Sequence, residues 1–316
     1  MARTPLSGTQ HVLRAGDAEA IVAGVGASLR AYTHEGRDLV VPFDADEVRP
    51  GYRGTTLAPW PNRVVDGRYT FAGEELQLAL TEPTRAHALH GLLAWTEYQP
   101  TDKGASHVTL TAVVEPQTGY PWRVTVTTTY SLDARGLHQS VSVRNDSDGA
   151  APWGTGPHPY LRAGGGRVDD WTLHLPAGRV LETTEDRLIP TTLSPVEVDA
   201  SRFDYRSART IGAAEIDHAY TALERDADGR ATVTVTDAAG TGAAISWDAA
   251  CPWVQVHTAD QPDGEASAAH RIGLAVEPMT CAPDAFNAGR YDFDAGLIVL
   301  EGGGEHTASW TISPVG

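Results

Sequence analysis

The chain has 316 residues, of which 41% are hydrophobic and 21% charged, with a formal net charge of -17. This composition is typical of a folded globular protein and excludes a disordered chain. The electrostatic field of this negative charge repels nucleic acids and anionic membranes, so we expect neither as a partner. We expect a neutral substrate. The single lysine, Lys103, lies in a polar segment that resembles an exposed turn, which argues against chemistry that needs a desolvated lysine.

The N-terminal segment, MARTPLSGTQHVLRAGDAEA, lacks the apolar run of a signal peptide. No later stretch is long and apolar enough to predict a membrane span. We therefore expect a soluble cytoplasmic protein. Cys251 and Cys281 are too few for a disulfide framework and form no CxxC pair, so we predict two thiols in the core.

Alternation of apolar and polar residues with a period of two dominates the chain, as in half-buried strands. Hairpins are predicted at 63–65 with 68–71, 124–130 with 137–143 and 231–236 with 243–247, followed by strands at 297–300 and 308–312. In the first hairpin, Asp66-Gly67 supplies the positive φ angles of a type I′ turn.

The succession of hairpins without intervening helices favours an all-β, antiparallel β-sandwich over a parallel α/β sheet. One large domain or two smaller ones both fit the length. The 20 prolines and 32 glycines are scattered and form no linker, so we predict a single domain over residues 1–316. No GxGxxG or GxxxxGK[ST] phosphate loop is present, and we expect no cofactor.

Four short segments carry polar side chains that a simple strand protein does not need. They are Trp60-Pro61-Asn62-Arg63, His87-Ala88-Leu89-His90-Gly91, Gly156-Pro157-His158-Pro159-Tyr160 and Ala275-Val276-Glu277-Pro278-Met279. The two flanking prolines restrict the backbone of His158 and the directions open to its imidazole. Such a histidine suits proton transfer near neutral pH, and a histidine hydrogen-bonded inside a turn is the equal alternative.

Glu277 follows the apolar run 272–276 and precedes a proline, so we predict that it lies at a strand end and is partly buried. Partial burial raises the pKa of a carboxyl group towards that of a useful base. The alternative is a solvent-facing glutamate at a sheet edge. Likewise, Arg63 and Asp217 are compatible with an ordinary ion pair, and His90 with a satisfied core histidine.

A metal site is a further alternative, because His87-x-x-His90 together with His158, Asp217 and Glu277 offers ligands for zinc or iron. The spacing matches neither HExxH nor a tight facial-triad motif. We therefore prefer a metal-free site.

Taken in order from about Leu57 to the C-terminus, these segments resemble the aldose 1-epimerase (galactose mutarotase) family. The matching segments are 57–67, similar to Pro-x-x-Asn-Arg-apolar-x-x-Gly, then Leu89-His90-Gly91, 156–160, Ile216-Asp217-His218, 254–258, and 276–278 with 283–287. The resemblance implies a galactose mutarotase-like β-supersandwich. It also implies an enzyme that interconverts the α and β anomers of an aldose without a cofactor.

By the same resemblance, His158 is the general acid and Glu277 the general base that open and reclose the sugar ring. The groups that hold the hydroxyls of the sugar would be Arg63, His90, Asp217, Gln255 and Asn62. Tryptophans that could stack on the sugar are Trp60, Trp95, Trp153 and Trp253. We expect a monosaccharide substrate and a monomer or homodimer.

Three departures from the family pattern leave the sugar open. They are His-Pro-Tyr at 158–160 in place of Asn-His before an aromatic residue, His257 where tyrosine is common, and Glu-Gly-Gly-Gly at 301–304 in place of Pro-Gly.

Two other functions also stay open. One is a non-catalytic carbohydrate-binding protein. The other is an epimerase of a phosphorylated sugar, which needs a basic cluster such as Arg162 and Arg167 would supply.

Overall fold

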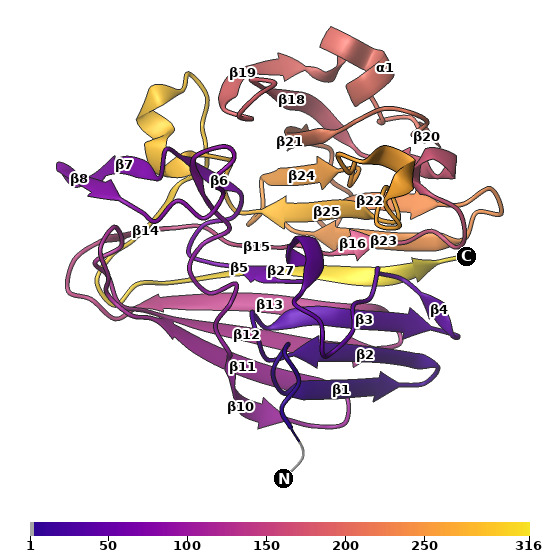
Figure 1. The fold of residues 1–316 in the computed structure, drawn as a ribbon, viewed down its shortest axis with the longest axis horizontal. Coiled ribbons are helices and arrows are strands. Elements are labelled where there is room, and N and C mark those ends of the chain that lie inside the picture. The colour runs from indigo at the N-terminus through magenta and orange to yellow at the C-terminus, as the bar shows by residue number, and fades with distance from the viewer. Residues whose placement is uncertain (1–2) are drawn as a thin grey trace.

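The computed structural model describes residues 3–316 and consists mainly of antiparallel sheets (Figure 1). Within that range the only α-helix is the four-residue α1 (Ala200–Phe203), and the other helical elements are short 3₁₀ turns at Pro50–Tyr52, Val168–Asp170, Val196–Asp199, Gly264–Ala266 and Ala285–Arg290. The predicted all-β class is confirmed. No helix among the described residues has the length and apolar character that spanning a bilayer requires.

Three large sheets form the body of the molecule. The nine-stranded sheet has the order β10 (Gln99–Lys103), β11 (His107–Val114), β12 (Val124–Asp133), β13 (Gly136–Asn145), β27 (Glu305–Val315), β23 (Gly242–Trp247), β22 (Ala231–Thr236), β17 (Thr172–His174) and β20 (Arg209–Thr210). The six-stranded sheet has the order β16 (Tyr160–Leu161), β25 (Leu274–Met279), β24 (Trp253–His257), β21 (Asp217–Leu223), β18 (Ala177–Thr183) and β19 (Pro190–Pro195). The four-stranded sheet contains β1 (Gln10–Ala15), β2 (Ala18–Ala23), β3 (Ser28–His34) and β4 (Arg37–Asp38).

Four two-stranded ribbons complete the fold. They are β5 (Thr56–Leu57) with β15 (Gly156–Pro157), β6 (Arg63–Val65) with β9 (His87–Leu89), β7 (Arg68–Phe71) with β8 (Glu74–Gln77), and β14 (Ala151–Trp153) with β26 (Ile298–Leu300). Two of these ribbons, β5–β15 and β6–β9, position pocket residues described below.

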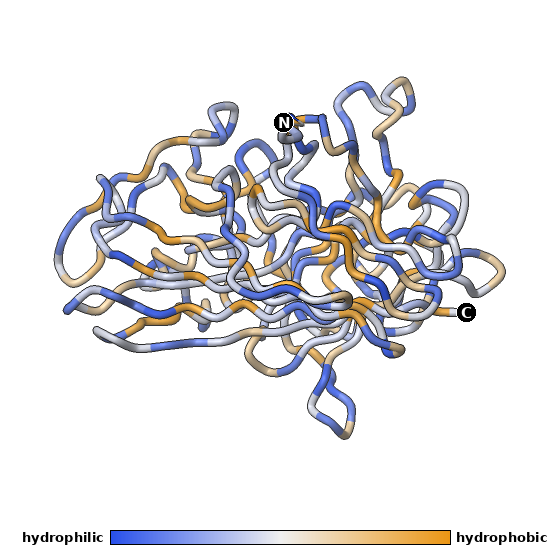
Figure 2. Tube along the Cα trace, turned by 90° about the horizontal axis from the view of Figure 1, so that it is seen from below, coloured by the Kyte–Doolittle hydropathy of each residue, from blue (hydrophilic) through white to orange (hydrophobic). Residues whose placement is uncertain are grey.

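The sheets stack as two layers around a shared core. The four-stranded sheet packs on β11 and β12 of the nine-stranded sheet, and buried side chains of the six-stranded sheet belong to the same hydrophobic core as those of β22 and β23. Alternation explains this packing: β12 reads VTVTTTYSLD, and its valines and Tyr130 are buried while most of its threonines face outwards. Hydrophobic stretches run along the strands in the interior, whereas the projecting loops are largely hydrophilic (Figure 2).

Most of the predicted strands are confirmed. The second and third hairpins pair as expected, as β12 with β13 and β22 with β23. The two C-terminal strands are β26 and β27, which pair with β14 and with β13 and β23 respectively. Cys251 and Cys281 are buried and free, as predicted. Lys103 is exposed, although it ends β10 and does not lie in a turn.

The first predicted hairpin is wrong. Asp66 and Gly67 have the expected positive φ angles of 56° and 60°, but β6 pairs with β9 and β7 pairs with β8. The hairpin forms instead across Ala72-Gly73, whose φ angles are also positive. Arg63–Val65 is wholly buried, whereas β7 and β8 are largely exposed. Because of this difference in burial, β6 pairs with the distant β9 and not with β7, its neighbour along the chain.

Candidate active site

A pocket of about 140 Å³ lies over the six-stranded sheet and is lined by Gly51, Tyr52, Asn62, Arg63, His90, His158, Tyr160, Asp217, Gln255, His257 and Glu277. All seven residues singled out from the sequence line it, although they come from six separate stretches of the chain. A larger hollow of about 510 Å³ over the β7–β8 hairpin contains none of them. The convergence of so many polar groups on one small concavity identifies the candidate site.

Strand register builds the floor of the pocket. Glu277 on β25 lies opposite Gln255 on β24, and His257 on β24 lies opposite Asp217 on β21. Alternate residues of a strand share a face, so these four side chains point to one side while Val254, Val256 and Val276 join the core on the other. Three neighbouring strands thus present two carboxylates, an amide and an imidazole to one space.

The predicted position of Glu277 at a strand end is wrong. The residue lies inside β25 and is only 2% exposed, and Pro278 continues the strand opposite Val254. The other neighbour, β16, pairs with β25 only at Leu274 and Ala275. Pro278 therefore stands where β25 has one ladder partner, a position that tolerates its missing N–H.

The β6–β9 ribbon forms one wall. Arg63 pairs with Leu89, and the next residue, His90, donates its backbone N–H to the carbonyl oxygen of Asn62 at 2.8 Å. Asn62 and His90 both have left-handed φ angles, 53° and 61°, which turn the chain at the rim of the site. Gly91 has φ 77°, and a Cβ there would overlap the backbone of Ala58. This explains the glycine of the Leu-His-Gly segment.

His158 lies in the link between β15 and β16. Its backbone N–H donates to the carbonyl oxygen of Thr55 at 3.0 Å, and its carbonyl oxygen accepts from Gly54 at 2.7 Å. With prolines on both sides, the backbone is held in place. The ring is buried, and its Nε2 lies 3.3 Å from Oε1 of Glu277.

Several buried polar atoms of the pocket make no hydrogen bond to protein groups. They are Nδ1 of His158, Oε2 of Glu277, Nδ1 of His90 and Oε1 of Gln255. Buried donors and acceptors are normally paired, since an unpaired one costs about 1–3 kcal/mol. Their gathering in one pocket indicates a site made to bind a polar molecule.

Burial governs the protonation of the His158–Glu277 pair. It raises the pKa of Glu277 well above its ordinary value, with Asp217 adding to this effect and Arg63 opposing it. It lowers the pKa of His158 to about 3, reinforced by His257. A carboxylic acid beside a neutral imidazole holds the same single proton as a carboxylate beside an imidazolium. The pair therefore holds one proton, and both pKa shifts favour Glu277 as its resting position.

Asp217 stays ionised under opposing influences. Burial raises the pKa of its carboxyl group, but His257, Arg63, a hydrogen bond from Gln255 and His218 together lower it below the usual value. Gln255 Nε2 donates to Asp217 Oδ1 at 2.6 Å. Arg63 is more distant, with 3.9 Å between its Nη2 and Asp217 Oδ2. The ordinary Arg63–Asp217 ion pair considered from the sequence is thus a loose one.

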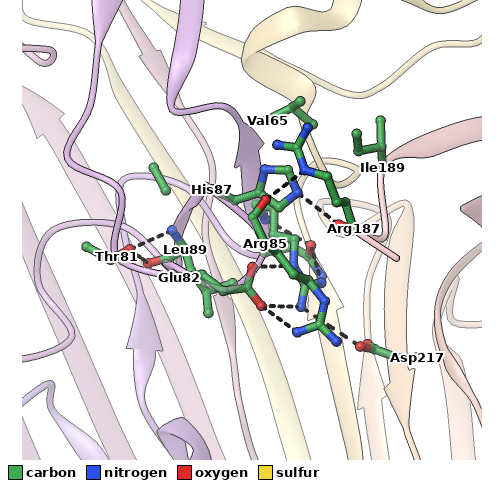
Figure 3. A network of polar contacts seen from close by, with 12 residues as sticks. Val65, Thr81, Glu82, Arg85, His87, Leu89, Arg187, Ile189 and Asp217 are labelled. Atoms are coloured by element: carbon green, nitrogen blue, oxygen red, sulfur yellow. Dashed lines mark hydrogen bonds and ion pairs between the residues drawn. The ribbon is translucent and has the colours of Figure 1, made fainter. Parts of the chain in front are cut away.

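The main partner of Arg63 is Glu82, a buried residue of the loop before β9. Arg63 Nε and Nη2 donate to the two oxygens of Glu82 at 2.8 and 3.0 Å, and Arg85 adds a bond of 2.9 Å. Figure 3 shows Glu82 and Arg85 in the polar network that runs from Asp217 to Arg187. Nothing in the sequence around Thr81-Glu82-Pro83 indicated this residue.

Four of the five candidate metal ligands, His90, His158, Asp217 and Glu277, line the pocket, but the fifth does not. His87 lies outside the pocket, where Nδ1 accepts from the N–H of Asp66 and Nε2 contacts the carbonyl oxygen of Arg187. Between residues 3 and 316, no group of three or more histidine, cysteine, aspartate or glutamate side chains has an arrangement suited to a metal ion. The metal alternative has no geometric support.

The basic cluster required by a phosphorylated sugar is not found at the positions named from the sequence. Arg162 pairs with Asp38 at 3.0 Å, and neither Arg162 nor Arg167 lines the pocket. Among the described residues, the lining includes a single arginine, Arg63, and its charge is opposed by Glu82.

The four tryptophans considered for stacking on a sugar differ in their exposure to solvent. Trp60, Trp153 and Trp253 are buried, whereas Trp95 is 55% exposed. The Trp95 ring lies 5.6 Å from that of Tyr52, and the Arg49 guanidinium lies 4.6 Å from the Trp95 ring centre. Tyr52 in turn lies 4.6 Å from His90 between ring centres. Trp95 therefore extends the aromatic wall of the pocket towards solvent.

Tyr52 was not indicated by the sequence. It closes the short turn Pro50–Tyr52 with an uncommon φ of 54°, and its ring also stacks at 6.4 Å from that of His158. The preceding Pro-Gly signals a turn, but only the fold brings that turn to the pocket. Tyr160 also stacks with His158, at 5.2 Å between ring centres.

Comparisons with known proteins place the chain in one family. The profile of the aldose 1-epimerase family matches residues 9–313. An uncharacterized Escherichia coli (strain K12) protein, YihR, is 36% identical over 307 residues, which cover 97% of this chain and 93% of YihR.

Solved structures share the fold. A putative aldose 1-epimerase from Escherichia coli K12 has a TM-score of 0.81 at 20% identity and covers 97% of this chain and 98% of its own. Galactose 1-epimerase from Lactobacillus acidophilus NCFM has a TM-score of 0.74 at 18% identity, with coverages of 94% and 92%. The supersandwich expected from the sequence is confirmed, and the chain belongs to the aldose 1-epimerase family.

Proposed function

We propose that this protein interconverts the α and β anomers of a free hexose or pentose by opening and reclosing the sugar ring. The observation that carries the proposal is the buried contact between His158 Nε2 and Glu277 Oε1, 3.3 Å apart in a pocket lined mainly by polar side chains. A non-catalytic sugar-binding protein needs the hydroxyl contacts but not a buried acid–base pair.

The spacing suits the reacting atoms of a cyclic aldose. The C1 hydroxyl oxygen and the ring oxygen are bonded to the same carbon, so a base and an acid that act on them must be neighbours. Glu277 takes the proton from the C1 hydroxyl while His158 gives one to the ring oxygen, and the C1–ring oxygen bond breaks to leave an open-chain aldehyde. After rotation about C1–C2, the same transfers in reverse close the ring on the other face.

The one-proton state of the pair balances this cycle. Opening starts from the form in which the proton of the pair has moved from Glu277 to His158, and it ends with protonated Glu277 and neutral His158. Both states carry one proton, and closure restores the first. The remaining polar groups, Arg63, Asn62, His90, Asp217 and Gln255, would hold the sugar hydroxyls and fix C1 against the pair.

The pH profile of activity follows from the one-proton state. Because burial lowers the pKa of His158 to about 3, a second proton binds only at strongly acidic pH. Because burial raises the pKa of Glu277, the single proton is lost only well above the ordinary range of a carboxyl group. We expect kcat to show no acidic limb near pH 6.5, the value of an unperturbed histidine. A limb at that pH in stopped-flow polarimetry would contradict the one-proton pair.

Trp95→Ala is expected to raise KM for a monosaccharide by about 3- to 10-fold with little change in kcat. Loss of a stacking surface removes binding energy of about 1 kcal/mol that ground state and transition state share. Val299→Ala, which truncates another exposed apolar side chain, serves as the matched control. A selective loss of kcat in Trp95→Ala would refute a binding role.

The proposal is tested by polarimetry of freshly dissolved α-anomers of glucose, galactose, xylose and arabinose and of their phosphates. We expect faster relaxation to anomeric equilibrium with at least one free sugar. Acceleration with phosphates alone would replace the proposed substrate class, and binding without acceleration would support the carbohydrate-binding alternative.

A further inference from the structure

Glu82 is a buried carboxylate that lies behind the pocket and does not line it. Its backbone exchanges hydrogen bonds with His87, at 3.0 Å to the His87 carbonyl oxygen and 3.3 Å from the His87 N–H. Its side chain is bonded only to arginines, Arg63 by two bonds and Arg85 by one. This two-point geometry fixes the plane and direction of the Arg63 guanidinium.

The two hydrogen bonds from Arg63 to Glu82 leave one oxygen of Asp217 free to bind a ligand. Arg63 Nη2 lies 3.9 Å from Asp217 Oδ2, beyond hydrogen-bond distance, and Asp217 is held at Oδ1 by Gln255. Without Glu82, the freed edge of Arg63 would face Asp217 as its nearest carboxylate. A closed Arg63–Asp217 pair would occupy the oxygen that a sugar hydroxyl needs.

We propose that Glu82 is a positioning residue of the active site: it holds Arg63 back from Asp217 and neutralises its charge beside the His158–Glu277 pair. This inference rests on the proposed function for its kinetic part. Its electrostatic part concerns the free protein and stands independently of any sugar.

The charge of Arg63 acts on the pKa of Glu277. The titratable and charged groups that line the pocket around it are His158, Tyr160, His257, Asp217, His90, Tyr52 and Arg63. Arg63 is the one that lowers the pKa of Glu277, against the larger effect of burial and the effect of Asp217. Removing the negative charge of Glu82 makes the surroundings of Glu277 one unit more positive, which favours ionised Glu277. The pair would then lose its proton at lower pH.

The test compares Glu82→Gln, Glu82→Asp and Arg85→Ala with the wild-type protein. For Glu82→Gln we expect KM to rise about 10-fold, the scale of one charged hydrogen bond, and the alkaline limb of kcat to move to lower pH. Glu82→Asp keeps the negative charge but has a shorter side chain. KM should therefore rise, while the alkaline limb of kcat should stay at the wild-type pH. Arg85 is half-buried and bonds the same carboxylate away from the pocket, so Arg85→Ala should change KM about twofold or less.

A second readout needs no sugar. The imidazole NMR signals of His158, assigned by difference from His158→Asn, report loss of the proton from the pair, and their midpoint should fall in Glu82→Gln. An unmoved midpoint together with a wild-type KM overturns the inference, even if Glu82→Gln yields less folded protein. If Glu82→Gln does not fold, a wild-type KM in Glu82→Asp overturns it. A wild-type protein inactive on every sugar would refute the proposed function, while the NMR midpoint would still decide the electrostatic role.

Discussion

Glu277→Gln is expected to lower kcat for mutarotation of a fresh α-aldose by about 10²-fold or more, the usual loss when a general base is removed. Glutamine keeps the size of the side chain and one acceptor oxygen. It cannot take the proton from the C1 hydroxyl. Because the side chain is buried and lies inside β25, its neighbours Gln255 and His158 constrain it, and the substitution tests chemistry more than packing.

Polarimetry gives kcat and KM for this variant, and Glu301→Gln, an exposed glutamate in the turn before β27, is the control. We expect KM to change little, since the amide can still accept a hydrogen bond. A rate near that of the wild type would remove Glu277 from the mechanism, and a large rise in KM with unchanged kcat would make it a binding residue.

His158→Asn is expected to cause a loss of similar size, about 10²-fold or more in kcat, because the ring oxygen would lose its proton donor. Asparagine between the same two prolines keeps the extended backbone held by Gly54 and Thr55. His174→Asn, on β17 outside the pocket, serves as the control.

The double variant is more informative than either single one. If the two residues share one proton, removing either disables the unit, so Glu277→Gln with His158→Asn should be little worse than one change alone. Losses that multiply would mean that the residues act independently. That outcome would contradict the one-proton pair, even if both single variants were slow.

Local patterns predicted the strands better than their partners. The hairpin of β12 and β13 has one short turn and two long alternating strands, so sequence proximity and burial favour the same pairing. Around Asp66-Gly67, two tight turns compete, and the partner of β6 lies beyond the β7–β8 hairpin at His87–Leu89. A period of two shows that a segment is a strand, but it does not choose between partners. The single-domain organisation stays a prediction.

The seven predicted residues all line the pocket: short motifs indicated Asn62, Arg63, His90, His158 and Glu277, whereas Gln255 came from the family resemblance alone. The surroundings of these residues were not predictable. The burial of Glu277 depends on which strands flank β25 on each side, whereas the apolar run before Glu277 and the proline after it indicated a strand end. Tyr52 and Glu82 stand in no motif, and their roles arise from contacts with residues distant in sequence, His158 and Arg63. The catalytic and binding roles of the seven predicted residues stay proposals.

The most direct test of the central claim is NMR exchange spectroscopy on an aldose at anomeric equilibrium in D₂O, with a catalytic amount of protein. We predict that the wild-type protein accelerates exchange between the α and β H1 signals while H1 and H2 keep their full intensity, because ring opening breaks no C–H bond. We expect neither the Glu277→Gln nor the His158→Asn variant to do so at a comparable rate. Exchange no faster than in buffer with every sugar, or loss of H2 to solvent, would contradict the account.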